Sequence, residues 1–333
     1  MAAFVGELMK TARVMAPVRR DGVGYFEWLE SADQLDATCV VPRSSPKAAL
    51  LPRCETLFGW RLEKGEQRIV PPPEPIPQIL FGLHPCDVRA IATLDAVFAS
   101  DPSPDRLYLA RRAVTTVIGR GSLADPATAF FRELGVDPMD NGGCDLFLAP
   151  LDPDRHVLEI ISDKGRALLP ACERFPKADD RALALLADLR KSSAAKTEAN
   201  PGLEQLAAKL AGMFESDLWS RIHEHCAGCG VCAFLCPTCH CFDIQEEQRG
   251  DRGARVRVWD TCQFGLFTRH ASGHNPRTSQ KERLRQRIMH KFSYGIEKFK
   301  VPFCVGCGRC VGCCPANNDL RAILRTIRET PSE

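Results

Sequence analysis

The chain has 333 residues, of which 44% are hydrophobic and 26% charged, which is ordinary for a globular protein with room for two domains. Its formal net charge of +2 gives no strong field for binding nucleic acid or an anionic membrane surface. No run approaches the roughly 18 apolar residues of a membrane-spanning helix, and the N-terminus has no secretory signal pattern.

The first half of the chain predicts a mixed α/β domain over residues 1–190. Short strands are expected at Val14–Pro17 and Gly24–Trp28, on either side of the turn Arg19–Gly22, and a further strand is expected at Gly59–Glu63. These segments are bounded by the glycine and polar residues that turns require.

A buried strand followed by a helix is the clearest element of this half. The apolar run Ile79–Leu83 predicts the strand, and His84-Pro85-Cys86-Asp87 interrupts it. Asp87 can cap a helix over Val88–Ala99, whose apolar residues recur on one face.

The segment after the predicted strand Val114–Ile118 reads Gly119-Arg-Gly121-Ser-Leu-Ala124, which matches the pattern of a dinucleotide-binding loop. The glycine pattern alone is weak, and Asp125-Pro126 follows it at once. We therefore favour a plain strand-to-helix turn over nucleotide binding.

The next elements lead to a domain boundary. A hairpin is expected from Asp145–Pro150 and His156–Ser162, followed by helical segments at 164–169 and 181–189. The polar residues 191–202 predict a linker. Leu203–Glu224 predicts an amphipathic helix that ends just before Cys226.

Cysteines dominate the remaining segment, because twelve of the seventeen lie between Cys226 and Cys314. Their number and spacing are unlike a disulfide framework and predict a reducing, cytoplasmic setting. Two runs share the spacing C-x2-C-x2-C-x3-C-P, by which bacterial ferredoxins hold [4Fe–4S] clusters. Zinc sites use C-x2-C pairs with a longer spacer, so two clusters are favoured over two zinc ions.

In two-cluster ferredoxins, the fourth cysteine of each run binds the other cluster. The predicted ligand sets are therefore Cys226, Cys229, Cys232 and Cys314 for one cluster, and Cys304, Cys307, Cys310 and Cys236 for the other. Cys313 competes with Cys314 for the last position of its run, and Pro315 favours Cys314. Crossed ligation requires the runs to pack together across an insertion of 67 residues.

Three further cysteines, Cys239, Cys241 and Cys262, are not needed by the two clusters. They predict a candidate third iron–sulfur site, for which Cys86 is the candidate fourth ligand because its turn at a strand end projects the side chain. Small buried thiols and a structural zinc ion are the alternatives. The other cysteines of the first half, Cys39, Cys54, Cys144 and Cys172, are interpreted as structural.

A basic segment, Lys281–Lys291, lies between the two runs. It predicts either a solvated helix or cations that lie near the clusters and stabilise the negative charge added on reduction. The fold class that follows is α+β: a mixed α/β domain, the linker 191–202, and a mainly helical dicluster ferredoxin-like domain over 203–333.

Several strings resemble one known family. Its cluster region is similar to Cys236-Pro-Thr-Cys-His-Cys241, Trp259-Asp-Thr-Cys262 and Gly273-His-Asn-Pro-Arg277, and its first half to Ser45-Pro-Lys47 and Gly82-Leu-His-Pro-Cys86-Asp87. These strings resemble the β subunit of cytoplasmic sulfhydrogenases, which are NAD(P)-linked [NiFe] hydrogenases, and the A subunit of anaerobic sulfite reductase. The resemblance also implies the grouping of Cys86 with the three extra cysteines.

The resemblance implies a subunit that relays electrons between a flavin/NAD(P)-binding subunit and a catalytic oxidoreductase subunit, within a hetero-oligomer. No substrate chemistry of its own, no nucleic-acid partner and no membrane span are expected. Two alternatives stay open: a subunit of a heterodisulfide-reductase-like complex, and an enzyme whose third iron–sulfur site is itself the reactive centre.

Overall fold

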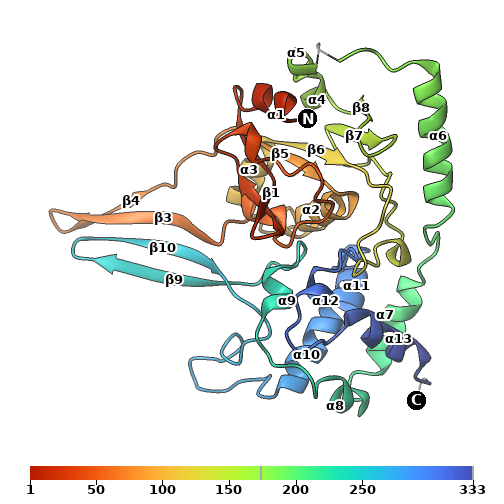
Figure 1. Ribbon diagram of the computed structural model, residues 1–333. Coiled ribbons are helices and arrows are strands. Elements are labelled where there is room, and N and C mark those ends of the chain that lie inside the picture. Colours follow the sequence, from red (N-terminus) through yellow and green to blue (C-terminus); the bar gives the residue numbers. More distant parts are fainter. Residues whose placement is uncertain (173–174, 332–333) are drawn as a thin grey trace.

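The computed structural model describes residues 1–172 and 175–331. Figure 1 shows two bodies, one built on a sheet and one built from helices, with a long flat arm projecting to the left. The helix α6 (Asp180–Ala194) runs down the side of the molecule from the first body toward the second.

The first body is built on a mixed sheet of six strands in the order β2-β1-β5-β6-β7-β8. Its four central strands are parallel, and an antiparallel partner closes each edge. The strands are β1 (Arg13–Arg20), β2 (Val23–Trp28), β5 (Gln78–Leu83), β6 (Thr115–Arg120), β7 (Leu146–Pro150) and β8 (His156–Ile160).

Helices cover both faces of this sheet, because alternate residues of its strands point to opposite sides. Leu80 belongs to the core on one face, and its neighbours Ile79 and Phe81 belong to the core on the other. The helices on the first face are α2 (Pro85–Phe98), α3 (Arg106–Ala113) and α6. On the second face lie α1 (Ala2–Leu8), α4 (Asp163–Arg166) and α5 (Leu169–Cys172).

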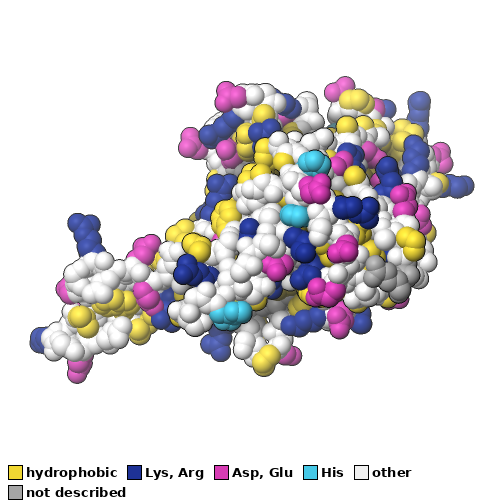
Figure 2. Space-filling view, turned by 90° about the horizontal axis from the view of Figure 1, so that it is seen from below, with side chains coloured by type: hydrophobic (Ala, Val, Ile, Leu, Met, Phe, Trp, Pro, Cys, Tyr) yellow, Lys and Arg dark blue, Asp and Glu magenta, His cyan; other side chains and the backbone are white. Residues whose placement is uncertain are grey.

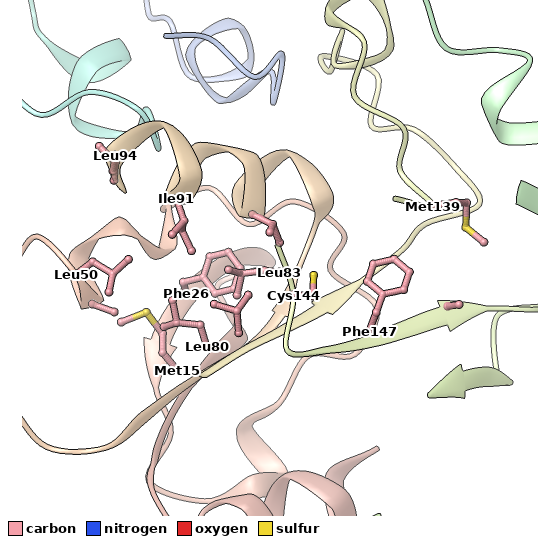
Figure 3. Packing of buried hydrophobic residues seen from close by; sticks show 14 of the residues in the cluster. Met15, Phe26, Leu50, Leu80, Leu83, Ile91, Leu94, Met139, Cys144 and Phe147 are labelled. Atoms are coloured by element: carbon pink, nitrogen blue, oxygen red, sulfur yellow. The ribbon is translucent and has the colours of Figure 1, made fainter. Parts of the chain in front are cut away.

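Figure 3 shows the core on the first face, where Ile91 and Leu94 of α2 point toward Leu80 and Leu83 of β5. Leu80, Leu83 and Leu94 are fully buried. Burying side chains of this size contributes about 1.5–3 kcal/mol each. This packing fixes the start of α2 at the carboxyl end of β5, which is where the turn His84–Asp87 lies.

The projecting arm is an antiparallel sheet with the order β4-β3-β10-β9. One hairpin comes from the first half of the chain, β3 (Cys54–Glu63) and β4 (Glu66–Val70). The other comes from the insertion between the cysteine runs, β9 (Phe242–Arg249) and β10 (Arg252–Trp259). Figure 2 shows the arm standing clear of the body from a second direction. The arm therefore ties the two halves of the chain together through backbone pairing.

The second body packs its helices around a separate core. Leu210, Trp219, Ile288, Phe292 and Ile327 are its most deeply buried members. The elements that contribute are α7 (Leu203–Gly212), α8 (Leu218–Ile222), α10 (Gln280–Met289), the π-helical turn His290–Tyr294 and α13 (Leu320–Glu329). The short helix α11 (Gly295–Phe299) follows the π-helical turn. Two single-turn helices, α9 (Val231–Phe234) and α12 (Arg309–Gly312), lie inside the cysteine runs.

The α+β class is confirmed, as are the buried strand at Ile79–Leu83 and the two hairpins of the first sheet. The arm hairpin β9–β10 was not predicted, so the second body is less purely helical than expected. The division into residues 1–190, 191–202 and 203–333 stays a prediction, and α6 continues four residues beyond 190.

Three local predictions need correction. Helix α2 begins at Pro85 and is capped by the side chain of His84, so Asp87 lies inside the first turn, where it pairs with Arg309. The predicted helix over Leu203–Glu224 is interrupted after Gly212, where the indole of Trp219 donates to the carbonyl of Met213. No helix directly follows β6; a loop leads to a short 3₁₀ turn at Arg132–Leu134, so the strand-to-helix turn predicted there is wrong.

Candidate metal centre

The first cysteine run and Cys314 surround one cavity. Gly228 and Gly230 have positive φ angles of 64° and 74°, which turn the backbone around the cavity and which suit residues without a Cβ. The residues that line it include Cys226, Cys229, Cys232, Cys310, Cys314, Gln263, Arg287 and Asn318.

Two donors face thiols of this cavity. The side-chain amide of Gln280 lies 3.2 Å from Sγ of Cys226, and the backbone N–H of Asn318 donates to Sγ of Cys314 over 3.2 Å. Such hydrogen bonds to sulfur orient the ligands of a metal centre and raise its reduction potential.

The second run surrounds a smaller cavity together with Cys236. Gly306 and Gly308 repeat the positive φ angles, at 63° and 76°. A loop of the first body covers this run, because the N–H of Phe130 donates to the carbonyl of Gly306 over 2.8 Å. The lining residues are Phe130, Cys236, Lys291, Cys304, Val305, Cys307, Gly308, Cys310 and Leu320.

The fourth cysteine of each run lies at the other run's cavity. Cys314 lines the first cavity and Cys236 lines the second, and Cys310 lines both, so the two cavities adjoin. This is the arrangement that crossed ligation requires. Cys313 is half-buried and, within residues 1–172 and 175–331, is not among the residues lining either cavity.

The residues of the first cavity fit an anionic iron–sulfur cluster. Thiolates are the ligands that iron–sulfur clusters take. Two side chains carry buried N–H groups without a hydrogen-bond partner in the described part of the chain, namely Nε and Nη2 of Arg287 and Nδ2 of Asn318. Buried donors of this kind are costly unless an acceptor is present. A negatively charged group in this cavity would supply one.

The interface between the two bodies lies next to the second cavity. Arg309 of α12 forms a bidentate ion pair with Asp87 of α2, with N–O distances of 2.6 and 2.8 Å, and also donates to the carbonyl of Pro42. Both charged side chains are almost completely buried. This pair holds the carboxyl end of β5 against the second cysteine run.

The three extra cysteines lie close to this region, but Cys86 does not join them. The thiols of Cys241 and Cys262 are hydrogen-bonded to each other. This bond and burial both raise the pKa of Cys241, whereas the same bond lowers the pKa of Cys262 to about 6 against the opposing effect of burial. Cys239 is hydrogen-bonded to Cys236 in the same way. Cys86 is fully buried and packs in a cluster with Val305 and Cys307 of the second run.

A buried lysine from the first body reaches the extra cysteines. Nζ of Lys47 donates to the carbonyl of Cys239 over 2.8 Å and lies 4.1 Å from the ring centroid of Trp259. Burial lowers the pKa of Lys47, while the thiols of Cys239, Cys236 and Cys241 act in the opposite direction. Sequence reasoning did not assign Lys47 a role; its place in Ser45-Pro-Lys47 was noted only through the family resemblance.

The four cysteines interpreted as structural lie apart from these sites. Cys144 and Cys172 belong to the cores on the two faces of the first sheet. Cys54 is exposed at the start of β3, and Cys39 packs against the backbone at Gly24.

Comparison with known proteins gives two matches. Residues 225–318 match the 4Fe-4S dicluster domain family, which implies two [4Fe–4S] clusters. The chain is 31% identical to the sulfhydrogenase 2 subunit beta of Pyrococcus furiosus over 330 residues, covering 98% of this chain and 95% of the relative. No solved structure matches. In the described part of the chain, no helix combines the length and apolar character needed to cross a membrane.

The predicted resemblance is therefore confirmed over nearly the full length, and the dicluster match covers all eight cysteines of the two runs. The chain therefore belongs to the sulfhydrogenase beta-subunit family, and its two adjoining thiol-lined cavities are those of an iron–sulfur electron-transfer subunit.

Proposed function

We propose that this subunit relays electrons between a flavin/NAD(P)-binding subunit and a catalytic subunit of the hydrogenase or sulfite reductase type, in a cytoplasmic hetero-oligomer. Iron–sulfur clusters accept and release electrons one at a time. The chain's own residues hold two such groups, separate them from water in part, and surround them with cations and N–H donors.

The observation that carries the proposal is the adjacency of the two cavities, which share Cys310 in their linings. We assign Cys226, Cys229, Cys232 and Cys314 to one cluster and Cys304, Cys307, Cys310 and Cys236 to the other. This assignment is supported by the position of each fourth cysteine at the other run's cavity.

A third iron–sulfur site at Cys239, Cys241 and Cys262 is part of the proposal. It is supported by the contact between Cys241 and Cys262 and by the buried cation Lys47 beside Cys239. Cys86 stays a prediction as the fourth ligand, and its packing beside Cys307 lends that role no support. Iron analysis separates the cases, because two cubane clusters give about 8 iron atoms per chain and three give about 12.

The relay is tested by anaerobic purification of the chain with the proteins that co-purify with it. We expect a flavoprotein and a second oxidoreductase subunit, and we expect reduced pyridine nucleotide to bleach the clusters only when the flavoprotein is present. A chain that purifies alone, or whose clusters stay oxidised in the complete complex under these conditions, would contradict the proposal.

A further inference from the structure

Two buried cations on one stretch of helix reach the thiol-lined cavities. Arg287 lies in the last turn of α10, and Lys291 lies in the π-helical turn His290–Tyr294 that follows it. Residues four apart share one face of a helix, so both side chains point the same way. Arg287 is 5% exposed and Lys291 is 3% exposed. A single π turn inside an α-helix is often found at a functional site.

Arg287 lies between the two ligand sets. It lines the first cavity together with Cys232, and Cys310 of the second set lines the same cavity. Nε and Nη2 of its guanidinium have no hydrogen-bond partner among the residues the structure describes. Burial acts to lower the pKa of Arg287, but the thiols of Cys232 and Cys310 act in the opposite direction and the net shift is upward.

Lys291 lies against the second ligand set. Its Nζ is 3.2 Å from Sγ of Cys236 and 3.6 Å from Sγ of Cys239, and it donates to the carbonyl of Phe303 over 2.8 Å. It lines the second cavity. Burial acts to lower its pKa, whereas the thiols of Cys236, Cys239 and Cys304 act to raise it, and the net shift is upward.

Neither cation forms an ion pair with a carboxylate in the described part of the chain, unlike Arg309 and Arg285. Arg309 is also buried beside the second run, but Asp87 cancels its charge. Arg285, on the same helix as Arg287, pairs with Glu215 at 3.2 Å. A negatively charged group in the cavities would balance Arg287 and Lys291, and burying an unpaired charge is strongly unfavourable.

We propose that Arg287 and Lys291 are fixed positive charges that raise the reduction potentials of the bound clusters. Arg287 acts on both clusters, and Lys291 acts on the one held by Cys304, Cys307, Cys310 and Cys236. The inference rests on the proposed function, since it presupposes that clusters occupy both cavities. It adds which residues set the reduction potential of each cluster.

The physical reason is the charge that reduction adds. An electron makes a thiolate-bound cluster more negative, and a fixed positive charge nearby stabilises that form more than the oxidised one. Both cations are shielded from water, so this effect is much larger than it would be at the surface. Removing either charge therefore lowers the potential of the cluster beside it.

The test is a redox titration of the anaerobically purified full-length chain, followed by electron paramagnetic resonance. The variants are Arg287→Gln and Lys291→Gln, with Arg285→Gln and Lys298→Gln as matched controls that lose the same charge from nearby positions. Lys298 is exposed on α11. We expect Arg287→Gln to make reduction of both clusters at least tenfold less favourable, a shift of about 59 mV for one electron. Lys291→Gln should shift the couple of the cluster held by Cys304, Cys307, Cys310 and Cys236 and leave that of the first run unchanged, and the controls should shift neither.

The outcomes separate this inference from the proposed function. Wild-type protein without iron and acid-labile sulfide would end the proposed function itself. If Arg287→Gln and Lys291→Gln bind clusters with unchanged reduction potentials, or if the controls shift the potentials as far, the role of the two cations is overturned. The proposed function would survive that result. If the neutral variants fail to load clusters, Arg287→Lys and Lys291→Arg decide. If these charge-keeping variants bind clusters with near wild-type reduction potentials, the positive charge is what the site requires. If they also fail to bind clusters, the role of the side chains is steric and the inference is overturned.

Discussion

The two cysteine runs share their spacing but differ in what surrounds them. In the first run Cys229 is exposed and Cys226 and Cys232 are half-buried, whereas in the second run Cys304 and Cys307 are buried. The second run lies under the loop at Phe130 and next to the ion pair of Arg309. The same motif thus forms an outward-facing site in one place and an interior site in the other.

The glycines of the two runs differ in the same way. A Cβ on Gly308 would lie 2.4 Å from the carbonyl oxygen of Thr128, and one on Gly306 would lie 2.4 Å from the backbone of Phe131. At Gly228 the closest atom belongs to the flexible side chain of Gln280. The comparison teaches that spacing alone specifies the ligands, whereas the first body specifies how tightly the second site is enclosed.

Loss of a ligand should have the largest effect and should distinguish the runs. Cys229→Ser and Cys307→Ser should each lose about 4 iron atoms per chain, because each removes one of four thiolates from a cubane. Cys307→Ser should also lower the thermal midpoint further, since its thiol packs in a buried cluster with Cys86 and Val305. Iron analysis and thermal unfolding under anaerobic conditions measure both. Cys313→Ser is the control and should keep all its iron; loss of iron there, with none from Cys314→Ser, would contradict the assignment.

Breaking the ion pair beside the second run should be the next largest effect. Asp87→Asn leaves the buried guanidinium of Arg309 without its counter-charge, so we expect the free energy of unfolding to fall by about 3–5 kcal/mol. Glu246→Gln is the matched control, because its pair with Arg255 is exposed on the arm and should contribute about 0–1 kcal/mol. Chemical denaturation measures both; equal losses would show that the interface at Asp87 does not enclose the second site.

A methyl group at Gly308 should have a smaller but still measurable effect. Gly308→Ala combines a left-handed backbone, which costs about 1–2 kcal/mol, with a collision against Thr128, which costs about 1–3 kcal/mol more. Gly250→Ala has a similar φ of 63° with no atom within 4 Å, so it should lose only the first amount. Denaturation midpoints that do not separate the two variants would argue against a tight cover over the second run.

The smallest expected effect is one of rate. A water-soluble oxidant should destroy the cluster of the first run faster than that of the second, since only the first run has an exposed cysteine. The decay of the two paramagnetic signals follows this, and the signal missing in Cys229→Ser identifies the first cluster. Equal decay rates would mean that the second site is as open to solvent as the first.

The sequence predicted the ligand positions far better than their surroundings. Three cysteines at fixed spacing and a following proline are a local pattern, so both runs could be assigned residue by residue. The enclosure of the second run could not be predicted in this way, because it depends on contacts between residues far apart in the sequence, such as Asp87 with Arg309 and Phe130 with Gly306. Asp87 was read as a local helix cap for the same reason.

The basic segment shows both sides of this limit. Its cations were predicted either to be solvated or to lie near the clusters, and the charges alone could not separate the two cases. Burial of Leu284, Ile288 and Met289 fixes which face of α10 turns inward, and Arg287 lies on that face. The hairpin β9–β10 was missed, although Arg255-Val-Arg-Val-Trp259 alternates with the period of a strand and a turn glycine, Gly250, precedes it.

Native mass spectrometry of the anaerobically purified chain tests the central claim most directly. We predict an added mass equal to at least two [4Fe–4S] clusters, falling by one cluster in Cys314→Ser even though Cys314 belongs to the second run. An added mass of zinc ions only, or a Cys314→Ser variant that retains every cluster, would contradict two iron–sulfur sites with crossed ligands.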